Sequence, residues 1–547
     1  MEDPKIKIYS ILKRITAEMG FQVSNFSVER PRDAAHGDFS SNIVMVLAKT
    51  LKKNPLAIAG SISKKIESSE FERIEAVAPG FINFYLSQKY LQSQVQNIIE
   101  KGKDYGSLTI GKGKKASVEF VSANPTGPLH IGNARGGPLG DAIANVLAKV
   151  GYKVTREYLH NDVGGQIHQL GATIGSKIGF YREFTFPKDK EERELAYQGT
   201  YIEELSNQVK SKLIELGGEG KFGFYSYDQQ CELFGGIGAE LMLIEILKDC
   251  EAMGIKFDKV RKESDLRKEV PQVLAKIKPA LKEKDGAKWF APADEFLKDR
   301  ETVVQKSDGQ FTYFASDIVY HDEKMAGNDL VIDVLGANHS GHVPRLKAVV
   351  KALGFNPDDL RVTLYQWVRL KRGEEIVKMS KRAGNFVTAK EVLDEVGKDA
   401  FRFFLLTPRS QTHMDFDLEL AKKKASDNPV FYVQYAYSRI CSIFKKAPAL
   451  NSQVDLSLLT ASEEIDLIRH LLRLPYLIEE AVKSLEVNPL TTYALEIATL
   501  FHKFYETQKV ITQDPKLTAA RLALLKATQI TLKNTLDLLG VSAPDHM

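Results

Sequence analysis

The amino-acid sequence predicts an α/β protein with a parallel sheet, preceded by a small α+β domain and followed by an all-helical domain. A strand, a turn rich in glycine and proline, a helix and a second strand follow one another between residues 117 and 159. That order, at the spacing of a helical crossover, opens a parallel α/β sheet. Amphipathic patterns fill the chain after about residue 426, and its 547 residues exceed what one hydrophobic core organises. We therefore expect three domains, at 1–110, 111–425 and 426–547.

The first domain is expected to combine helices with an antiparallel pair of strands. Apolar side chains recur at helical spacing within residues 8–15. Residues 74–87 alternate between apolar and polar as strands do, and Pro79-Gly80 interrupts them at a turn. The glycine- and lysine-rich segment 106–117 is typical of a linker to the next domain.

The second domain opens with a strand at 117–122, a helix at 141–151 and a strand at 152–159. A charged and partly helical segment, about 180–300, interrupts this pattern and is interpreted as an insertion. Short strands then resume and are expected to complete the sheet, at 302–315, 329–337 and 361–370.

The third domain is predicted to be a bundle of helices. Asp427 can cap the first helix, with Pro429 in its first turn. Three further amphipathic stretches begin near Ser462, Asn488 and Asp514.

Composition and charge narrow the function only slightly. Hydrophobic residues make up 43% of the chain and charged residues 27%, which is ordinary for a soluble globular protein. The net charge of +4 permits transient contact with a polyanion without requiring it. Cys231, Cys250 and Cys441 form no CxxC pair, which disfavours a disulfide framework and a cysteine zinc site. With no recognisable signal peptide or membrane-spanning stretch, we expect a soluble cytoplasmic protein.

One apparent phosphate-binding motif is rejected. Residues 106–113, GSLTIGKG, have the glycine and lysine spacing of a P-loop. Gly113 stands where a P-loop has the serine or threonine that holds magnesium, and the segment precedes a strand instead of joining a strand to a helix.

A stronger candidate is VEFVSANPTGPLHIGNARGG (118–137), which does join a strand to a helix. Its four glycines, Gly127, Gly132, Gly136 and Gly137, allow the backbone to approach a ligand closely. A helix N-terminus offers free N–H groups to phosphate, and the spacing of His130 and Asn133 places both on one side of a nucleotide. An ordinary glycine-rich loop with a capping asparagine would look the same.

A second candidate is VKMSKRAGN (377–385), which places Lys378 and Lys381 in a polar loop. Two ammonium groups on such a loop can follow a pyrophosphate leaving group as its charge develops. A lysine-rich surface loop without any function has the same composition.

In this order, the two segments resemble the HIGH and KMSKS signatures of class I aminoacyl-tRNA synthetases. Within that class the chain resembles the bacterial arginyl-tRNA synthetases over essentially its whole length. Asn133 replaces the last histidine of HIGH and Arg382 the last serine of KMSKS, changes that concern rate more than reaction type. Further segments that carry the resemblance are GDFSSN (37–42), APGFINF (78–84), SANPTGPLHIGN (122–133), YFASDIVYH (313–321), DNPVFYVQYAYSRICSI (427–443) and APDHM (543–547).

The resemblance implies a Rossmann-like catalytic domain, an N-terminal domain that contacts tRNA and a helical anticodon-binding domain. It implies activation of L-arginine by ATP to arginyl-adenylate, followed by transfer of arginine to the 3′ end of tRNA(Arg). Magnesium would arrive with ATP as a substrate complex, and no structural metal held by the protein is expected. We expect a monomer without membrane contact.

The resemblance also implies site residues. The expected catalytic residues are His130, Asn133, Lys378 and Lys381. The expected ATP-binding residues are Pro125, Thr126, Gly127, His130, Gly132, Asn133, His342, Met379 and Ser380. The expected arginine-binding residues are Glu119, Ser122, Asn124, Tyr313, Asp317 and His339. The expected tRNA-binding residues are Tyr432, Gln434, Tyr435 and Arg439.

Chemistry supports these assignments and leaves alternatives. A planar, permanently charged guanidinium calls for carboxylates and aligned acceptors, which Glu119 and Asp317 supply. Tyrosines on a helix can stack on unpaired bases, although they are more often half-buried core. His339 and His342 lack a third ligand nearby, so a metal site is not expected.

Three other functions fit parts of the sequence. A class I synthetase for another amino acid would share both signatures, although a cysteinyl enzyme would need zinc ligands near the first of them. A non-catalytic tRNA-binding paralogue would not need His130, Lys378 or Lys381. A small-molecule nucleotidyltransferase would lack large RNA-binding domains.

Overall fold

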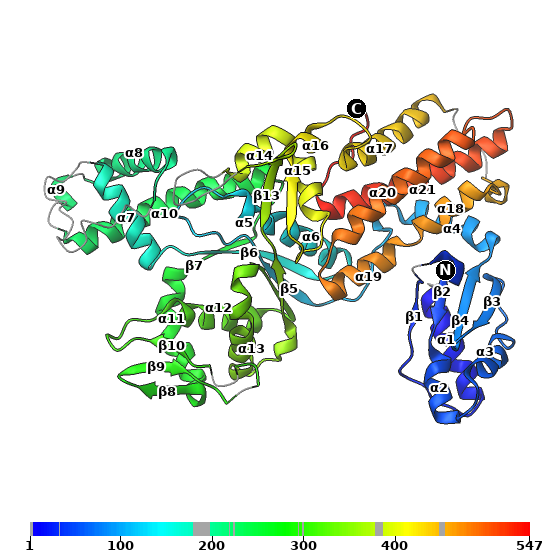
Figure 1. Ribbon diagram of the computed structural model, residues 1–547, viewed down its shortest axis with the longest axis horizontal. Coiled ribbons are helices and arrows are strands. Elements are labelled where there is room, and N and C mark those ends of the chain that lie inside the picture. Colours follow the sequence, from blue (N-terminus) through cyan, green and yellow to red (C-terminus); the bar gives the residue numbers. More distant parts are fainter. Residues whose placement is uncertain are drawn as a thin grey trace. The chain divides into compact units, whose positions relative to one another are not determined.

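Figure 1 shows the computed structural model of the chain, which describes residues 4–31, 33–178, 197–217, 219–222, 225–293, 295–297, 300–377, 387–447 and 454–547. The backbone divides into two compact units. The first comprises Met1–Tyr105, Ile443–Arg473 and Thr499–Thr531, and the second comprises Gly106–Ser442, Leu474–Ala498 and Leu532–Met547. Within the described ranges, no helix is both long enough and apolar enough to pass through a lipid bilayer.

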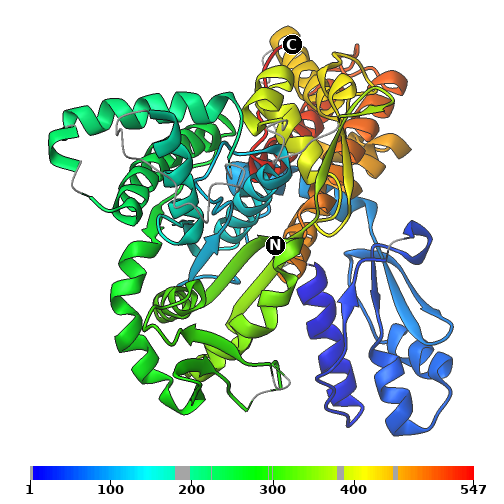
Figure 2. The same cartoon turned by 60° about the vertical axis from the view of Figure 1, so that its left-hand side comes forward.

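The first unit contains a four-stranded antiparallel sheet in the order β1-β2-β4-β3. Its strands are β1 (Val28–Glu29), β2 (Phe39–Ser41), β3 (Phe71–Val77) and β4 (Phe81–Leu86). Its first helices are α1 (Pro4–Glu18), α2 (Ile43–Leu51), α3 (Pro55–Ser63) and α4 (Gln88–Lys101). In Figure 2 the dark-blue α1 runs beside the blue strands. The strand pair predicted within 74–87 is confirmed, because β3 and β4 pair on either side of Pro79-Gly80.

The C-terminal part of the chain is helical, as the sequence predicts, and its described residues form five α-helices. They are α17 (Pro429–Lys446), α18 (Ser462–Leu471), α19 (Leu474–Ser484), α20 (Asn488–Thr507) and α21 (Pro515–Leu539). Helices α17, α20 and α21 each run from one unit into the other. Four helices therefore follow α17, where three stretches were predicted, because the turn before Leu474 divides one of them into α18 and α19.

The predicted cap of α17 is wrong by one residue. The Oδ1 atom of Asn428 accepts a hydrogen bond from the Val430 backbone N–H at 3.2 Å, as a capping side chain does. Asp427 instead forms an ion pair with Lys423 at 2.8 Å.

The second unit is built on a five-stranded sheet in the order β12-β11-β5-β6-β7, in which every neighbouring pair is parallel. Its strands are β5 (Lys115–Glu119), β6 (Lys153–His160), β7 (Lys259–Lys262), β11 (Leu330–Gly336) and β12 (Leu360–Tyr365). The central strands β5 and β11 are buried along most of their length, as expected for a sheet covered on both faces. Helix α6 (Gly136–Lys149) crosses between β5 and β6 and packs on both.

The segment 302–315, predicted to complete this sheet, does not join it, and the segment 361–370 joins it only in part, through β12. Strand β10 (Thr302–Gln305) pairs with β9 (Ala287–Phe290), which pairs with β8 (Leu281–Lys284), in a separate antiparallel sheet. Strand β13 (Val368–Arg372) lies between β14 (Glu375–Ile376) and β15 (Met414–Asp417) in a third sheet. Apolar patterning predicted strands in both segments, although helix α12 begins within the first of them, at Tyr313. The pattern could not assign the partners of the strands, because it carries no information about pairing.

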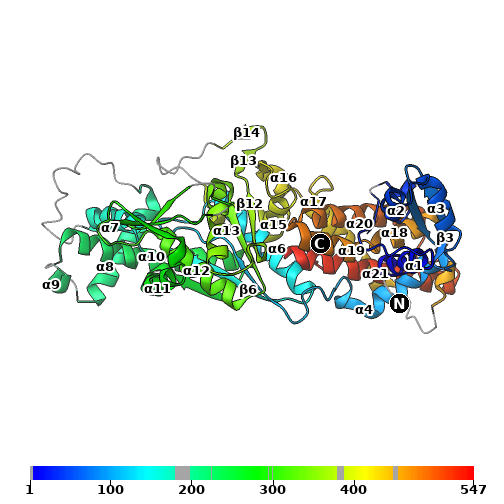
Figure 3. The same cartoon turned by 90° about the horizontal axis from the view of Figure 1, so that it is seen from below.

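Helices fill much of the segment predicted as an insertion at about 180–300. They are α8 (Thr200–Glu215), α9 (Glu219–Phe222), α10 (Tyr227–Ala252) and α11 (Glu263–Lys276), and α7 (Gly165–Ile178) precedes them. Figures 1 and 3 show α7, α8 and α10 side by side, and the three pack on one another. The same segment contains β7, the edge strand of the central sheet.

The remaining helices of the second unit are α5 (Ile131–Ala134), α12 (Tyr313–Gly327), α13 (Val343–Ala352), α14 (Ala389–Val396), α15 (Lys398–Leu406) and α16 (Leu418–Lys422). Short 3-10 turns complete the chain, at η1 (Ala34–His36), η2 (Gly102–Asp104), η3 (Lys278–Ala280), η4 (Ala337–His342), η5 (Pro357–Asp359) and η6 (Leu456–Leu458). Figure 3 shows β13 and β14 close to α16, and α16 packs on β13.

Buried Arg402 on α15 anchors the end of α21. Its guanidinium donates to the carboxylate of Asp141 at 2.6 Å and to the carbonyl oxygens of Met253 at 3.0 Å and Leu539 at 2.9 Å. Gly540 has a φ of +66°, and a Cβ atom there would lie 2.1 Å from Nη2 of Arg402. Glycine is therefore required where the chain passes over this guanidinium.

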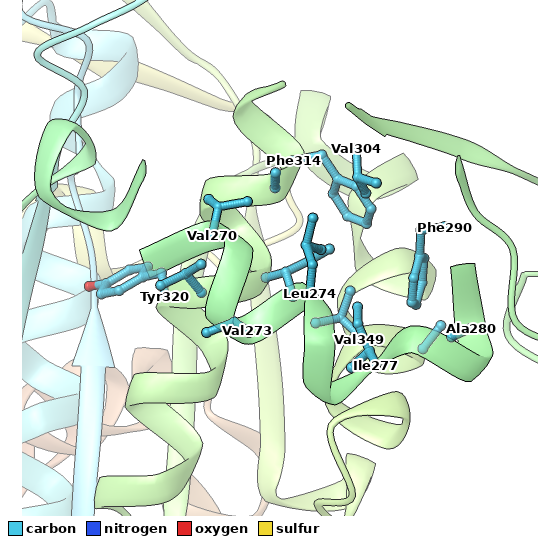
Figure 4. Close-up of a cluster of buried hydrophobic side chains, with 14 of the residues drawn as sticks. Val270, Val273, Leu274, Ile277, Ala280, Phe290, Val304, Phe314, Tyr320 and Val349 are labelled. Carbon is cyan, nitrogen blue, oxygen red and sulfur yellow. The ribbon is translucent and has the colours of Figure 1, made fainter. Parts of the chain in front are cut away.

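A cluster of apolar side chains fixes α12 against α11, α13 and the small sheet (Figure 4). Val270 and Leu274 of α11, Phe290 of β9 and Phe314 of α12 are among its members, each at most 6% exposed. The cluster holds α12 in place, and α12 carries two of the predicted arginine-binding residues, at 313 and 317.

We expect Phe290→Ala to lower the free energy of unfolding of this region by about 3–5 kcal/mol, because a fully buried ring is replaced by a cavity. Urea-induced unfolding followed by circular dichroism measures the effect. Lys288→Ala, on the same strand, is the control and should change stability by less than about 0.5 kcal/mol. Equal midpoints for the two variants would contradict the assignment of Phe290 to this core.

Candidate active site

A cavity of about 1250 Å³ lies at the carboxyl ends of β5, β6 and β11. In open parallel sheets this edge is where ligands bind. The cavity wall includes these residues predicted from the sequence: Glu119, Ser122, Asn124, His130, Gly132, Asn133, Tyr313, Asp317, His339 and His342. Residues spread over more than 200 positions of the sequence are thus brought to one site, and their individual roles remain proposals.

The chain leaves β5 through two residues in the left-handed region. Val121 has a φ of 67° and Ser122 a φ of 36°, and this conformation is strained for a β-branched residue such as valine. The strand predicted to reach residue 122 therefore ends at Glu119. The hydroxyl of Ser122 donates to Oε1 of Glu119 at 2.9 Å and accepts from the Leu159 backbone N–H at 3.1 Å. These bonds fix the turn and hold the Glu119 carboxylate at the cavity wall.

Helix α5 begins with His130 as its capping residue. Nδ1 of His130 accepts a hydrogen bond from the Gly132 backbone N–H at 3.0 Å, so the ring is held against the first turn. The Trp367 ring lies parallel to it, with 6.3 Å between the ring centroids. A Cβ atom at Gly132 would lie 2.9 Å from the His130 ring and 3.2 Å from the Trp367 ring. The glycine thus permits the close approach of both rings.

Asp317 presents a carboxylate to the cavity without a protein partner. Among the described residues, no hydrogen bond or ion pair reaches its side-chain oxygens, and only its backbone carbonyl accepts, from Nδ1 of His321 at 2.8 Å. Burial raises the pKa of Asp317 to about 7, assisted by Glu119 and Glu263 and opposed by His321 and Lys324. An unpaired carboxylate in such surroundings is suited to a cationic ligand.

Three rings line the wall beside Asp317. The ring centroids of Tyr313 and His342 are 6.2 Å apart, and those of His339 and His342 are 5.6 Å apart. Burial lowers the pKa of both histidines, and His339 lowers that of His342 further, so both are neutral at physiological pH. The part of the chain with described coordinates holds no cluster of three or more histidine, cysteine, aspartate or glutamate side chains placed to bind a metal ion.

Arg135, immediately after α5, joins three segments around the site. Its guanidinium is buried and donates to the backbone carbonyls of Thr412 at 2.8 Å, Arg409 at 2.7 Å, Gln366 at 3.1 Å and Pro408 at 3.3 Å. Burial lowers its pKa to about 10, which leaves it charged at neutral pH. Arg135 thereby fixes the helix that starts at His130 relative to the segment that carries Trp367.

Some predicted residues are not part of the described wall. The cavity lining does not include Pro125, Thr126 or Gly127, and Tyr201 of α8 donates to the carbonyl of Thr126 at 3.1 Å. A Cβ atom at Gly127 would lie 3.2 Å from the Tyr201 ring, so this glycine accommodates a protein side chain. The predicted residues Lys378, Met379, Ser380 and Lys381 lie outside the described residues.

The structure adds residues that the sequence interpretation did not select. Asn161 and Gln166, which follow β6, form hydrogen bonds with the side chain of Asn124 at 2.8 Å each. Their position after the neighbouring parallel strand would have predicted them, since such strand ends meet at one edge. Trp367 and Arg369 also line the cavity, but they belong to no motif that the sequence analysis recognised. Their position depends on the pairing of β13 with β15.

Comparison with known proteins agrees with this architecture along the whole chain. Three domain-family models match in order: "Arginyl tRNA synthetase N terminal domain" at residues 5–86, "tRNA synthetases class I (R), catalytic domain" at 94–209 and 236–415, and "DALR anticodon binding domain" at 433–547. The chain belongs to the arginyl-tRNA synthetase family.

Individual relatives extend the match over nearly full length. The "Arginine--tRNA ligase" of Syntrophotalea carbinolica is 42% identical over 544 residues, covering 96% of this chain and 95% of that protein. The protein of the same name from Staphylococcus aureus is 39% identical over 547 residues, covering 97% and 96%. The crystal structure of Thermus thermophilus arginyl-tRNA synthetase superimposes with a TM-score of 0.78 at 22% identity, covering 99% of this chain and 100% of that one, so the two share a fold.

Helix α17 of this family member places the predicted tRNA-binding residues in different environments. Tyr435 is 40% exposed, its ring stacks on that of Phe431 with 6.2 Å between the centroids, and Cζ of Arg439 lies 5.3 Å from the centroid of the Tyr435 ring. Gln434 is buried, and its Nε2 donates to Asp399 at 2.8 Å and to the carbonyl of Ser542 at 2.9 Å. Tyr432 is half-buried. Tyr435 and Arg439 are therefore better placed to meet RNA than Gln434.

We expect Arg135→Met to leave several buried carbonyl groups without a donor and to lower the free energy of unfolding by at least about 2 kcal/mol. Turnover should fall as well, because α5 is no longer fixed relative to Trp367. Thermal melting and steady-state charging measure the two effects. Arg372→Met, which removes a half-exposed arginine paired with Glu395, is the control. Similar melting temperatures for the two variants would contradict this role of Arg135.

Proposed function

We propose that the protein is an arginine–tRNA ligase that activates L-arginine with ATP and transfers it to the 3′ end of tRNA(Arg). The observation that carries this proposal is the Asp317 carboxylate, which has no side-chain partner among the described residues and faces the same cavity as the helix that His130 caps. A cation-accepting group and a nucleotide-binding helix N-terminus in one cavity are what arginine activation needs. Membership of the arginyl-tRNA synthetase family supports the same reaction.

The reaction proceeds in two steps. A carboxylate oxygen of arginine attacks the α-phosphorus of ATP, and the bond to the β-phosphate oxygen breaks, so that arginyl-adenylate and pyrophosphate form. A ribose hydroxyl of the terminal adenosine of tRNA then attacks the arginyl carbonyl carbon, and AMP leaves as the carbon–oxygen bond to its phosphate breaks. The protein contributes positioning and stabilisation of charge, and no covalent enzyme intermediate is needed.

Different residues of the cavity wall bind the two small substrates. Asp317 pairs with the guanidinium, and Tyr313 packs against it or donates a hydrogen bond to it. His130 and Asn133 contact ATP at the start of α5, where backbone N–H groups and the helix dipole favour phosphate. Lys378 and Lys381, outside the described residues, stabilise the departing pyrophosphate. Magnesium accompanies ATP as part of the substrate.

The C-terminal helices bind the tRNA. The family model for this region is that of a DALR anticodon-binding domain, which supports the assignment. Phe431, Tyr435 and Arg439 follow one another at helical spacing and form a stack on α17, and such stacks accept unpaired bases. The cytoplasmic location and the monomeric state expected from the sequence stay predictions.

Charging assays test the proposal directly. The purified protein is incubated with ATP, total tRNA and each of the twenty amino acids in turn, and aminoacylated tRNA is measured. Arginine alone should be attached, and pyrophosphate exchange with arginine should require tRNA. Efficient use of another amino acid would favour a different class I synthetase, whereas tRNA binding without any charging would favour a non-catalytic paralogue.

We expect Asp317→Asn to lower kcat/KM for arginine by about 10- to 150-fold, the equivalent of one charge-assisted hydrogen bond of about 1.5–3 kcal/mol. The melting temperature at pH 8 should stay the same or rise. The reason is that the folded protein disfavours ionisation of this carboxyl group, so its contribution to stability is lost as pH rises toward 7. Steady-state charging and a melting curve decide the matter. Normal charging with a clear drop in melting temperature would make Asp317 a structural residue.

The pH dependence of kcat/KM for arginine should reflect the ionisation of the Asp317 carboxyl group. Arginine stays charged throughout, whereas Asp317 is neutral below its pKa of about 7 in the free protein. The value of kcat/KM for arginine should therefore fall as pH is lowered from 8 to 6, approaching tenfold per pH unit well below 7. The ratio of wild type to Asp317→Asn, taken at each pH, removes the titration of ATP and other groups. A ratio that does not change with pH would refute the prediction.

A further inference from the structure

Three carboxylates lie side by side on neighbouring strands of the five-stranded parallel sheet. Asp333 of β11 is in register with Glu119 of β5, and Glu119 is in register with Glu157 of β6. Residues in register on neighbouring parallel strands point to the same face. The three are 1%, 6% and 3% exposed. Like charges in such a row repel one another strongly unless cations compensate them.

Lys324 of α12 supplies the compensation at one end of the row. Its side chain is fully buried, and its Nζ atom lies 2.7 Å from Oε2 of Glu119 and 2.7 Å from Oδ1 of Asp333. Burial disfavours its charge, but Asp333 and Glu119 outweigh burial and raise its pKa. Burial likewise opposes the charge of Asp333, but Lys324 and His321 lower its pKa. The ammonium is therefore fixed between two carboxylates.

The same ammonium determines what the cavity offers to a ligand. With Lys324 on Oε2 and the hydroxyl of Ser122 on Oε1, the Glu119 carboxylate is held in one orientation. Asp333 is likewise occupied, by Lys324 and by Nε2 of His321 at 3.0 Å. Asp317 lies two helical turns before Lys324 on the same face of α12, and its carboxylate has no such partner among the described residues.

We propose that Lys324 is a positioning residue for arginine selection. Its ammonium orients Glu119 and neutralises Asp333, so that Asp317 and one fixed edge of Glu119 meet the guanidinium. The proposal rests on arginine being the substrate, since it concerns how that amino acid is bound. Lys324 does not line the cavity and acts through Glu119. A guanidinium presents a rigid fork of donors, so a rotation of Glu119 disrupts its binding more than that of a compact ammonium.

The decisive variant is the charge-neutral pair Lys324→Met with Asp333→Asn. It removes one positive and one negative charge, so the net charge around the cavity is unchanged, and Glu119 loses one of the two side-chain contacts that orient it. We expect KM for arginine to rise by at least about 10-fold. KM for ATP should change little, whereas the melting temperature should fall, because the buried Glu119 carboxylate loses the ammonium beside it. A residue that is only structural would lower the melting temperature without separating the two KM values.

Two comparisons isolate the contact between Lys324 and Glu119. Asp333→Asn alone keeps that contact and should raise KM for arginine much less than the pair does. Lys259→Met is the matched control. Lys259 pairs with Glu157, the third carboxylate of the row, at 3.7 Å and with Glu323 of α12, and no ion pair among the described residues joins it to Glu119. The KM of this variant for arginine should match that of the wild type.

A folded double variant with a KM for arginine within about twofold of the wild type would overturn the proposal. If the double variant does not fold, Ser122→Ala provides the test, because it removes the other hydrogen bond to Glu119 without changing charge. A KM for arginine that rises by about 2- to 10-fold supports the proposal, and an unchanged one overturns it. A wild type that fails to charge arginine would instead refute the proposed function, so the two failures are distinguishable.

Discussion

The ion pairs of the Lys324 ammonium with Glu119 and Asp333 are the interactions on which the second unit depends most. They join α12 to β5 and β11, the two strands whose ends form the floor of the cavity. Without them, Glu119 and Asp333 would place adjacent negative charges in the interior of the sheet. Burying ionised groups is costly unless each has a partner of opposite charge and saturated hydrogen bonds. The apolar cluster that packs on α12 also contributes, because it fixes the helix in the position from which Lys324 contacts both carboxylates.

Arg135 is also a buried cationic side chain, but its partners are backbone carbonyl groups and not carboxylates. Lys324 is a compact charge between two anions, whereas Arg135 uses its planar fork to satisfy carbonyl groups of the backbone. The first arrangement fixes charge, and the second fixes the relative position of chain segments. Lys324 thereby orients the acidic groups of the cavity wall, and Arg135 fixes the part of the wall at which His130 caps a helix.

The sequence predicted most of the fold and some of the residues that line the cavity, and the reasons are local. The strand, turn and helix around His130 carry their own signals of glycine, capping and periodicity, and the spacing of Tyr313 and Asp317 predicted one helical face. Lys324 and Arg135 could not be found in this way. The partners of Lys324 include one 205 positions away, and those of Arg135 begin 231 positions away. Only the pairing of the strands reveals such contacts, and short apolar segments do not specify their pairing, as the misplaced β10 and β13 show.

The passage of the chain over Arg402 has a consequence for how the protein folds during synthesis. The guanidinium donates to the carbonyl of Leu539, and the glycine that covers it is Gly540. Synthesis proceeds from the N-terminus, so Arg402 and its partner Asp141 are made long before Gly540. A nascent chain therefore holds Arg402 incompletely covered until the segment around Gly540 is available. Domains usually fold as units during synthesis, but the second unit is completed only when α21 can pack on it.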